Sequence, residues 1–355
     1  MIKQINSPFE GGKGDVFKHN SNIDSHLKIM YSRRRFIGLT AAAAALAVVP
    51  FNCASAAEPK KTKVKKPNSK FGGVQVGAIT YSWRSMSPTA EDTLKYCLQC
   101  GISSIEMMSN TIELYAGIPQ GPARPLRDAT DEQKAAFQKA MQETAEAQKK
   151  WRISAPMTKF KELRKMYNKA GVKIHIAKFS PENWSDEEID YAFNAAKTLG
   201  AKGVSTEIGD KSCQKLGPFA QKHGMYAIMH QHLQPGEPGW SFEKFLDYSS
   251  AIMLNFDAGH YFGATGLHPN GIIEKLHNRI FSIHMKDKTG PKGNPPNTNM
   301  EWGKGETPIT DILLLIKKNK WPINVDIELE YPVPDGSDAV AEVKKCVEFC
   351  RKILS

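Results

Sequence analysis

The sequence lacks a long apolar run after residue 57, so residues 58–355 contain no stretch of membrane-spanning length. It also lacks a general excess of one charge. Residues 1–70 hold 13 Lys and Arg against 4 Asp and Glu, whereas the whole chain has 48 against 37. Residues 71–355 are left with 35 basic and 33 acidic side chains. This balance argues against the broad basic surface that binding to a polyanion such as nucleic acid requires.

The basic residues near the N-terminus belong to a predicted export signal. Three arginines in the run SRRRF, residues 32–36, precede an apolar stretch, and Ala54-Ser55-Ala56 follows it as a cleavage site. The arginine run is typical of a twin-arginine signal. We therefore expect residues 1–57 to be a leader and the mature protein to be periplasmic or secreted. Both Met1 and Met30 fit as the translation start.

A Lys-rich, solvated linker is predicted at residues 58–70, followed by one domain over residues 71–355. In that domain short β-rich runs alternate with amphipathic helical patterns, and glycines follow several of the helices. We predict strands at 74–82, 102–108, 172–178, 202–208, 225–232, 252–258, 280–286 and 323–330.

Eight strand–helix units over about 280 residues predict an α/β fold, a (β/α)8 TIM barrel. The alternative, a doubly wound sheet, requires a Gly-rich phosphate loop after the first strand, and the sequence there is Tyr81-Ser82-Trp83-Arg84. The segment 109–160 is longer than one crossover needs. We therefore expect it to carry an additional loop or helix over the mouth of the barrel.

Five of the six cysteines follow the leader. Cys97 with Cys100, and Cys346 with Cys350, have helical spacing in amphipathic segments, which favours thiols that face the core. The alternative is a four-Cys zinc site, which requires the first and last helices of the barrel to meet.

Polar residues gather on seven of the predicted strands, most of them at the carboxyl ends, where TIM barrels carry their active sites. Burying so many carboxylates around one axis is costly unless a cation or a polar ligand compensates them. These residues are Glu106, His175, Lys178, Glu207, His230, His232, Asp257, His260, His284, Lys286, Asp287, Glu328 and Glu330.

Four of these residues form a plausible site for a divalent metal ion: Glu207, Asp257, His284 and Glu328. Three carboxylates and one imidazole suit Mn²⁺, Mg²⁺, Co²⁺ or Zn²⁺ without distinguishing them. Glu330 has the same strand parity as Glu328, so either fits as the ligand on the last strand. An open coordination position would make the metal a Lewis acid for carbonyl chemistry.

The segments NFDAGHY, SIHMKD, GKGETPITDIL and DIELEY resemble the sugar phosphate isomerase/epimerase family, with its xylose isomerase-like TIM barrel, and in particular exported Bacteroidetes-type members. The resemblance covers residue 74 to the C-terminus. It implies the same metal ligands, Glu207, Asp257, His284 and Glu328. It also implies that His260 contacts the substrate. Further candidates for substrate contact are His232, Lys286, Glu106 and Trp83, whose ring would stack on a sugar face.

The expected function is metal-dependent removal of a proton next to a carbonyl, with Glu207 or Glu328 as the base. Return of the proton gives an epimer or an isomer, and loss of a β-leaving group gives elimination. Because phosphorylated sugars are largely cytoplasmic, export favours a non-phosphorylated sugar or glycoside. We favour a 3-keto-glycoside lyase or hydratase over a ketose 3-epimerase.

Two other classes of function remain as alternatives. The first is an exported sugar-binding protein without catalysis. The second, a metal-dependent abasic-site endonuclease, is disfavoured by the near-neutral charge of residues 71–355 and by the predicted export. The sequence gives no prediction of the oligomeric state.

Overall fold

The computed structural model describes residues 66–355. The predicted leader, its cleavage site and most of the predicted linker lie outside the described residues. Among the described residues, no helix is both long enough and apolar enough to cross a membrane.

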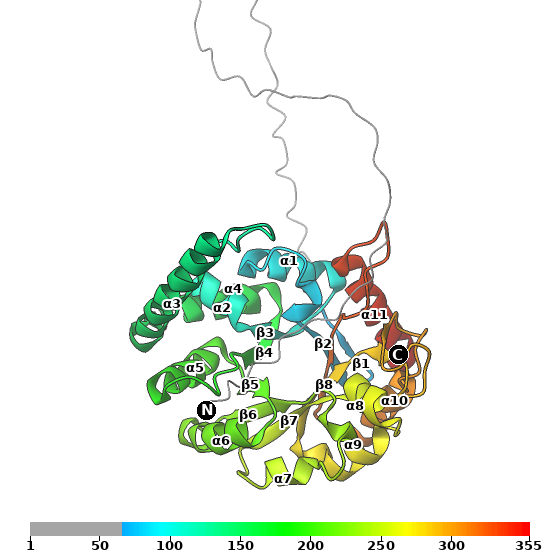
Figure 1. The fold of residues 1–355 in the computed structure, drawn as a ribbon. Helices are drawn as coiled ribbons and strands as arrows, with labels where there is room; N and C mark the ends of the chain where they lie inside the picture. The colour runs from blue at the N-terminus through cyan, green and yellow to red at the C-terminus, as the bar shows by residue number, and fades with distance from the viewer. Residues whose placement is uncertain (1–65) are drawn as a thin grey trace, which may run out of the picture. The chain divides into compact units, whose positions relative to one another are not determined.

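Eight parallel strands close into a barrel in sequential order (Figure 1). Closure comes from β2 pairing with β3 on one side and with β11 on the other. This confirms the predicted fold. The barrel strands are β2 (Val74–Ile79), β3 (Ser104–Met108), β4 (Lys173–Lys178), β5 (Gly203–Glu207), β6 (Tyr226–His230), β7 (Ile252–Asp257), β8 (Ile280–Met285) and β11 (Asn324–Ile327).

The helices form a ring outside the strands, as Figure 1 shows. Several helices end at a glycine with a positive φ, for example Gly101 at 75° and Gly200 at 85°, a conformation that costs glycine little. The helices are α1 (Ala90–Cys100), α2 (Ser109–Ala116), α3 (Asp131–Ser154), α4 (Thr158–Ala170), α5 (Asp186–Leu199), α6 (Asp210–His223), α7 (Phe242–Leu246), α8 (Ala258–Thr265), α9 (Asn270–Leu276), α10 (Ile309–Asn319) and α11 (Ala339–Leu354).

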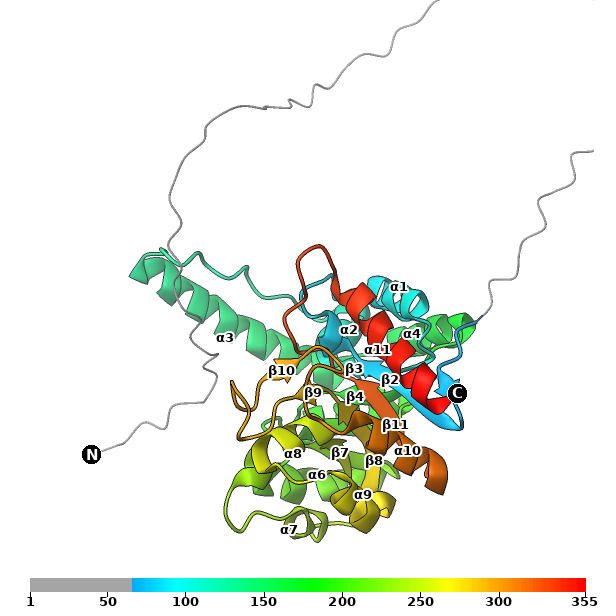
Figure 2. The ribbon, with the colours of Figure 1, turned by 90° about the vertical axis from the view of Figure 1, so that its right-hand side faces the viewer.

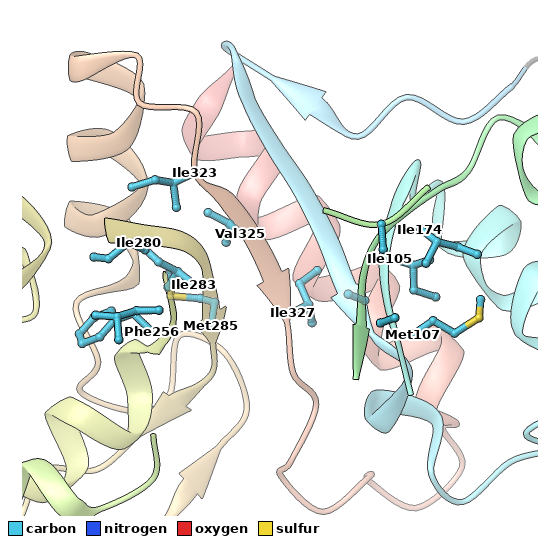
Figure 3. Packing of buried hydrophobic residues seen from close by; sticks show 14 of the residues in the cluster. Ile105, Met107, Ile174, Phe256, Ile280, Ile283, Met285, Ile323, Val325 and Ile327 are labelled. Atoms are coloured by element: carbon cyan, nitrogen blue, oxygen red, sulfur yellow. The ribbon is translucent and has the colours of Figure 1, made fainter. Parts of the chain in front are cut away.

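The hydrophobic core lies between the barrel and its helices and extends around the barrel. Figure 3 shows part of it, with Ile105 and Met107 of β3 near Ile327 of β11, and Ile283 and Met285 on the neighbouring β8. These side chains are fully buried or nearly so. The core holds the strands in a fixed register, which places the residues at their carboxyl ends in one layer.

The predicted strands are right in order but too long at several carboxyl ends. Residues Thr80–Trp83 form a 3₁₀ turn after β2, β6 ends at His230, and β11 ends at Ile327. Three short strands lie outside the barrel proper: β1 (Lys70–Phe71), β9 (Asp287–Lys288) and β10 (Asn299–Met300).

The long segment after β3 contains α2 and the additional helix α3. Figure 2 shows α3 reaching beyond the other helices, and none of its residues is fully buried. Its last turn is anchored by Arg152, whose guanidinium lies 2.8 Å from Glu113 of α2 and 3.3 Å from Glu188 of α5. An additional loop or helix was expected over the mouth of the barrel, but this helix packs on the outer ring, against α5.

Candidate metal centre

The barrel positions five polar residues at the ends of consecutive strands. Glu207 ends β5 and is in register with His230, which ends β6. Asp257 ends β7 and is in register with His284 of β8, and Glu328 follows β11 directly. Parallel pairing thus brings residues that are far apart in sequence into one layer.

Four of these side chains form a compact buried cluster: His230, Asp257, His284 and Glu328. One potential ligand atom from each residue lies within 4.8 Å of those of the other three. His230 Nε2 is 3.3 Å from Asp257 Oδ2, and His284 Nδ1 is 2.9 Å from Glu328 Oε2. We call these four residues the central cluster.

Negative charge exceeds positive charge in and around the central cluster. Lys286 Nζ lies 2.9 Å from Asp257 Oδ2, 2.8 Å from Glu328 Oε2 and 2.7 Å from Glu330 Oε2. Two further carboxylates, Glu106 and Glu207, complete a group of five, and the second nearby ammonium group is that of Lys178. Two lysines alone do not balance five carboxylates, so positive charge on His230 and His284, whose pKa values these carboxylates raise against the effect of burial, or a bound cation has to supply the rest.

The donor set of the central cluster fits a divalent cation. His284 Nδ1 and Glu328 Oε2 are buried and lack a hydrogen-bond partner, although each is close to another polar group. A cation bound by these atoms would satisfy both of them and offset the excess negative charge. Two imidazoles with two carboxylates suit Zn²⁺, Mn²⁺ or Co²⁺.

Electrostatics keep the acids of this cluster ionised. Burial alone would raise the pKa of Asp257 and of Glu328, but the ammonium group of Lys286 and the neighbouring imidazoles together outweigh burial and hold both pKa values below their usual range. Burial also opposes charge on Lys286, yet its carboxylate neighbours raise its pKa above the usual value. The pKa of His260 is lowered by burial, so its imidazole is neutral at physiological pH.

Glu207 lies beside the central cluster, at its outer edge. Its carboxylate contacts His230 Nδ1 at 2.9 Å, His232 Nε2 at 3.0 Å and Lys178 Nζ at 2.7 Å. The side chains of Glu207 and His232 are 40% and 49% exposed, so solvent or a ligand can reach both. Glu207, His230 and His232 also form a second group with metal-ligand spacing.

The structure brings together three of the four predicted metal ligands, Asp257, His284 and Glu328, and adds His230. Sequence reasoning noted His230 only as a polar strand end. The signal that favours it is its position as the last residue of its strand, directly in register with Glu207. Of the two candidate ligands on the last strand, Glu328 belongs to the central cluster and Glu330 does not, although both contact Lys286.

The predicted substrate-contact residues differ in their access to a ligand. His260 Nε2 is 3.1 Å from Lys286 Nζ, and both side chains border the central cluster. Two expectations need correction. Glu106 has an exposed fraction of 0%, and its carboxylate contacts His284, so it lies beneath the cluster. Trp83 is 3% exposed and packs against Tyr96, which leaves almost no ring face for a sugar.

The loop between β8 and α10 is organised by a carboxylate whose role the sequence did not reveal. Asp287 accepts hydrogen bonds from the backbone N–H groups of Gly303, Gly305 and Thr307, at 2.8 to 3.2 Å. A Cβ at Gly305 would collide with this carboxylate. Asp287 is thus a structural residue that holds the GKGET segment beside the site.

The alternative four-Cys zinc site receives no support within residues 66–355. Helices α1 and α11 do pack together, as that idea required, and Cys100 Sγ lies 3.3 Å from the carbonyl oxygen of Val340. The described cysteines are all buried and free, and neither group with metal-ligand spacing contains one.

Comparisons with known proteins agree with this architecture. Residues 207–353 match the family model described as "Xylose isomerase-like TIM barrel". None of the curated proteins compared with the chain is significantly similar to it.

Several solved structures resemble the chain over most of its length. A sugar phosphate isomerase/epimerase from Parabacteroides distasonis has a TM-score of 0.52 and 15% identity, covering 80% of this chain and 96% of that one. A probable 3-DHS dehydratase from Bacillus anthracis has a TM-score of 0.52 and 13% identity, covering 78% and 98%. D-Psicose 3-epimerase from Clostridium cellulolyticum, solved with D-tagatose, has a TM-score of 0.52 and 11% identity, covering 79% and 100%.

At these identities the similarity to solved structures concerns the fold alone. The closed barrel of eight parallel strands, the family match over its second half and the structural neighbours all agree. The fold of this chain is a xylose isomerase-like TIM barrel.

Proposed function

We propose that this protein is an exported, metal-dependent enzyme that removes a proton next to a carbonyl group of a non-phosphorylated sugar or glycoside. Within that class we favour a 3-keto-glycoside lyase or hydratase over a ketose 3-epimerase. The observation that carries the proposal is the central cluster, in which buried carboxylates exceed the ammonium groups that contact them.

The metal would be held by His230, Asp257, His284 and Glu328, with Glu207 as the alternative ligand that the sequence favoured. When bound, the ion would polarise a substrate carbonyl and acidify the adjacent C–H group. The residues of this chain then have to orient the sugar and move the proton.

Glu207 is the proposed base. Its side chain is reachable from solvent, and Lys178, His230 and His232 outweigh its burial and hold its pKa below the usual range. It is therefore ionised at neutral pH and ready to accept the proton from carbon. Its neighbours also limit its basicity, so the acidity of the substrate C–H group has to come from the polarised carbonyl.

The second proposed carboxylate, Glu328, approaches from the opposite side of the barrel, since three strands separate β5 from β11 in the sheet order. A proton can be delivered to the opposite face of the same carbon by way of Glu328, the proton on Glu207 can return to the neighbouring carbon, or it can stay on Glu207 while a β-substituent leaves with the electron pair. These routes give an epimer, an isomer and an elimination product, respectively.

The charge of the site supports a non-phosphorylated substrate. Both Lys178 and Lys286 are already paired with carboxylates, and the surrounding acids would repel a phosphate group. His232 and His260 are positioned to contact hydroxyl groups, the first from an exposed position and the second beside Lys286.

The test is incubation of the metal-loaded and metal-free protein with glucosides, their 3-keto forms and ketoses in deuterated buffer. We expect metal-dependent product formation and deuterium incorporation next to the carbonyl, detected by NMR. Glu207→Gln should retain its metal and lose exchange, whereas Asp210→Asn, on the same side of the barrel but paired with Lys244, should behave like wild type. Tight sugar binding without exchange or turnover would instead support a binding protein.

A further inference from the structure

Glu106 is a buried carboxylate without a part in the proton transfer described above. It lies on β3, and its Oε2 is 2.7 Å from His284 Nε2 and 2.8 Å from Asn255 Nδ2. A carboxylate placed this deep in a barrel is costly unless its contacts compensate it. Its contacts lead directly to one member of the central cluster.

The surrounding hydrogen bonds determine which ring nitrogen of His284 carries a proton. Ser282 Oγ donates to Asn255 Oδ1 at 2.6 Å, which turns the Asn255 amide nitrogen toward Glu106. The reverse orientation would place an amide oxygen against the carboxylate. Glu106 Oε2 therefore accepts from Asn255, and it also accepts from His284 Nε2–H.

With Nε2–H donated to Glu106, Nδ1 is the ring nitrogen of His284 that faces the central cluster. It lies 2.9 Å from Glu328 Oε2, and because Glu328 and Glu106 outweigh burial and raise the pKa of this imidazole, a cation bound at Nδ1 would replace a proton there. We propose that Glu106 is a positioning residue of the metal site, which holds His284 in the tautomer and ring orientation that present Nδ1 to the cation. The proposal rests on the metal binding of the proposed function.

The second imidazole of the cluster is arranged similarly. His230 has Nε2 directed to Asp257 and Nδ1 to Glu207. The two carboxylates differ in access, because Glu207 is 40% exposed whereas Glu106 is fully buried. Glu207 can therefore act on a substrate as well as orient a ligand, while Glu106 acts only through His284.

The chain provides a matched control. The buried pair of His175 and Asp326 also joins an imidazole to a carboxylate, at 2.8 Å, but belongs to neither group with metal-ligand spacing. Loss of either carboxylate removes a buried hydrogen bond to an imidazole. Only the loss of Glu106 is expected to alter the metal site.

The experiment measures Zn²⁺ and Mn²⁺ affinity of the full chain by competition with a chromogenic chelator. We expect Glu106→Gln to weaken metal affinity by about 10- to 100-fold, which is typical when the carboxylate behind a ligating histidine is lost. Glu106→Asp should recover part of the affinity, and Asp326→Asn should bind like wild type. Histidine ring ¹⁵N NMR of the Zn²⁺ form should show His284 protonated at Nε2 in wild type and a changed signal in Glu106→Gln.

Wild-type affinity in Glu106→Gln, or an equal loss in Asp326→Asn, would overturn the proposal. If Glu106→Gln does not fold, Glu106→Asp is compared with wild type and Asp326→Asn in its place. Wild-type metal affinity together with an unchanged His284 NMR signal in Glu106→Asp would then count against the proposal. If wild type itself binds neither metal, the proposed function fails too. The two failures are distinguishable. Failure of the proposed function is seen in wild type itself, whereas failure of the role of Glu106 is seen only when the variants are compared with wild type.

Discussion

Two polar clusters lie inside the same barrel, and they differ in how their charges are balanced. Nearer the strand starts, His175 Nε2 contacts Asp326 at 2.8 Å and Nδ1 contacts Ser104 Oγ at 2.9 Å. Here one carboxylate faces one imidazole, and both ring nitrogens have partners, although Asp326 Oδ1 has none. At the carboxyl ends, the central cluster combines excess carboxylates with unpartnered atoms on His284 and Glu328.

The comparison separates a structural from a functional use of buried polar groups. A paired imidazole and carboxylate stabilise the fold only as long as both are present, since removal of either leaves the other unsatisfied. A cluster with surplus negative charge is strained without a further cation. Mutation of the His175–Asp326 pair should therefore mainly change the stability of the fold. Mutation of the central cluster should mainly change ligand binding.

The largest expected effect is that of Asp257→Asn on the metal site. Removal of a ligand carboxylate should weaken metal affinity by more than about 100-fold, beyond what loss of a supporting residue costs. The metal-free variant should also be less stable than wild type, because the lowered pKa of Asp257 means that its charged form, paired with Lys286, stabilises the fold. Metal titration and calorimetry check both parts, and a metal affinity within about tenfold of wild type would contradict the contrast.

The next effect is that of Asp326→Asn on stability. The carboxylate is fully buried and pairs with His175, so the variant should lose about 2 kcal/mol of unfolding free energy. Denaturant unfolding of wild type and variant gives the value, with metal affinity measured in parallel. Unchanged stability with altered metal binding would reverse the roles assigned to the two clusters.

A smaller effect is expected from Lys178→Met on pH dependence. Lys178 is among the groups that, against burial, hold the pKa of Glu207 below its usual value of 4.5. Activity is lost as pH falls through the pKa of the base. Removal of the ammonium group raises that pKa, so the acid limb of the kcat/KM profile should move to higher pH. If the acid limb of the kcat/KM profile of Lys178→Met lies at the same pH as in wild type, Glu207 is not the titrating base.

The smallest effect is expected from His232→Ala. This imidazole is half-exposed and contributes one contact to Glu207, so its loss should raise KM about threefold with little change in kcat. Steady-state kinetics on the favoured substrate provide the check. A loss in kcat as large as that of Glu207→Gln would place His232 among the proton-transfer groups.

The fold could be predicted from the sequence because strand–helix alternation and helix-terminal glycines are local signals. Asp257 and His284 could be predicted as members of the site for the same reason, since each lies at a recognisable strand end. The place of His230 in the central cluster could not be predicted, because it depends on side-chain directions at two paired strand ends. The burial of Glu106 beneath His284 depends on β3 and β8 lying across the barrel, which strand patterns alone do not specify.

The central claim is tested most directly by locating the metal in crystals of the metal-loaded protein by anomalous diffraction. We predict one strong anomalous peak within about 2.0–2.6 Å of ligand atoms from His230, Asp257, His284 and Glu328. Glu106 would lie behind His284, without contact to the ion. A peak bound instead by Glu207 and His232, or no peak in the barrel after metal loading, would contradict the account.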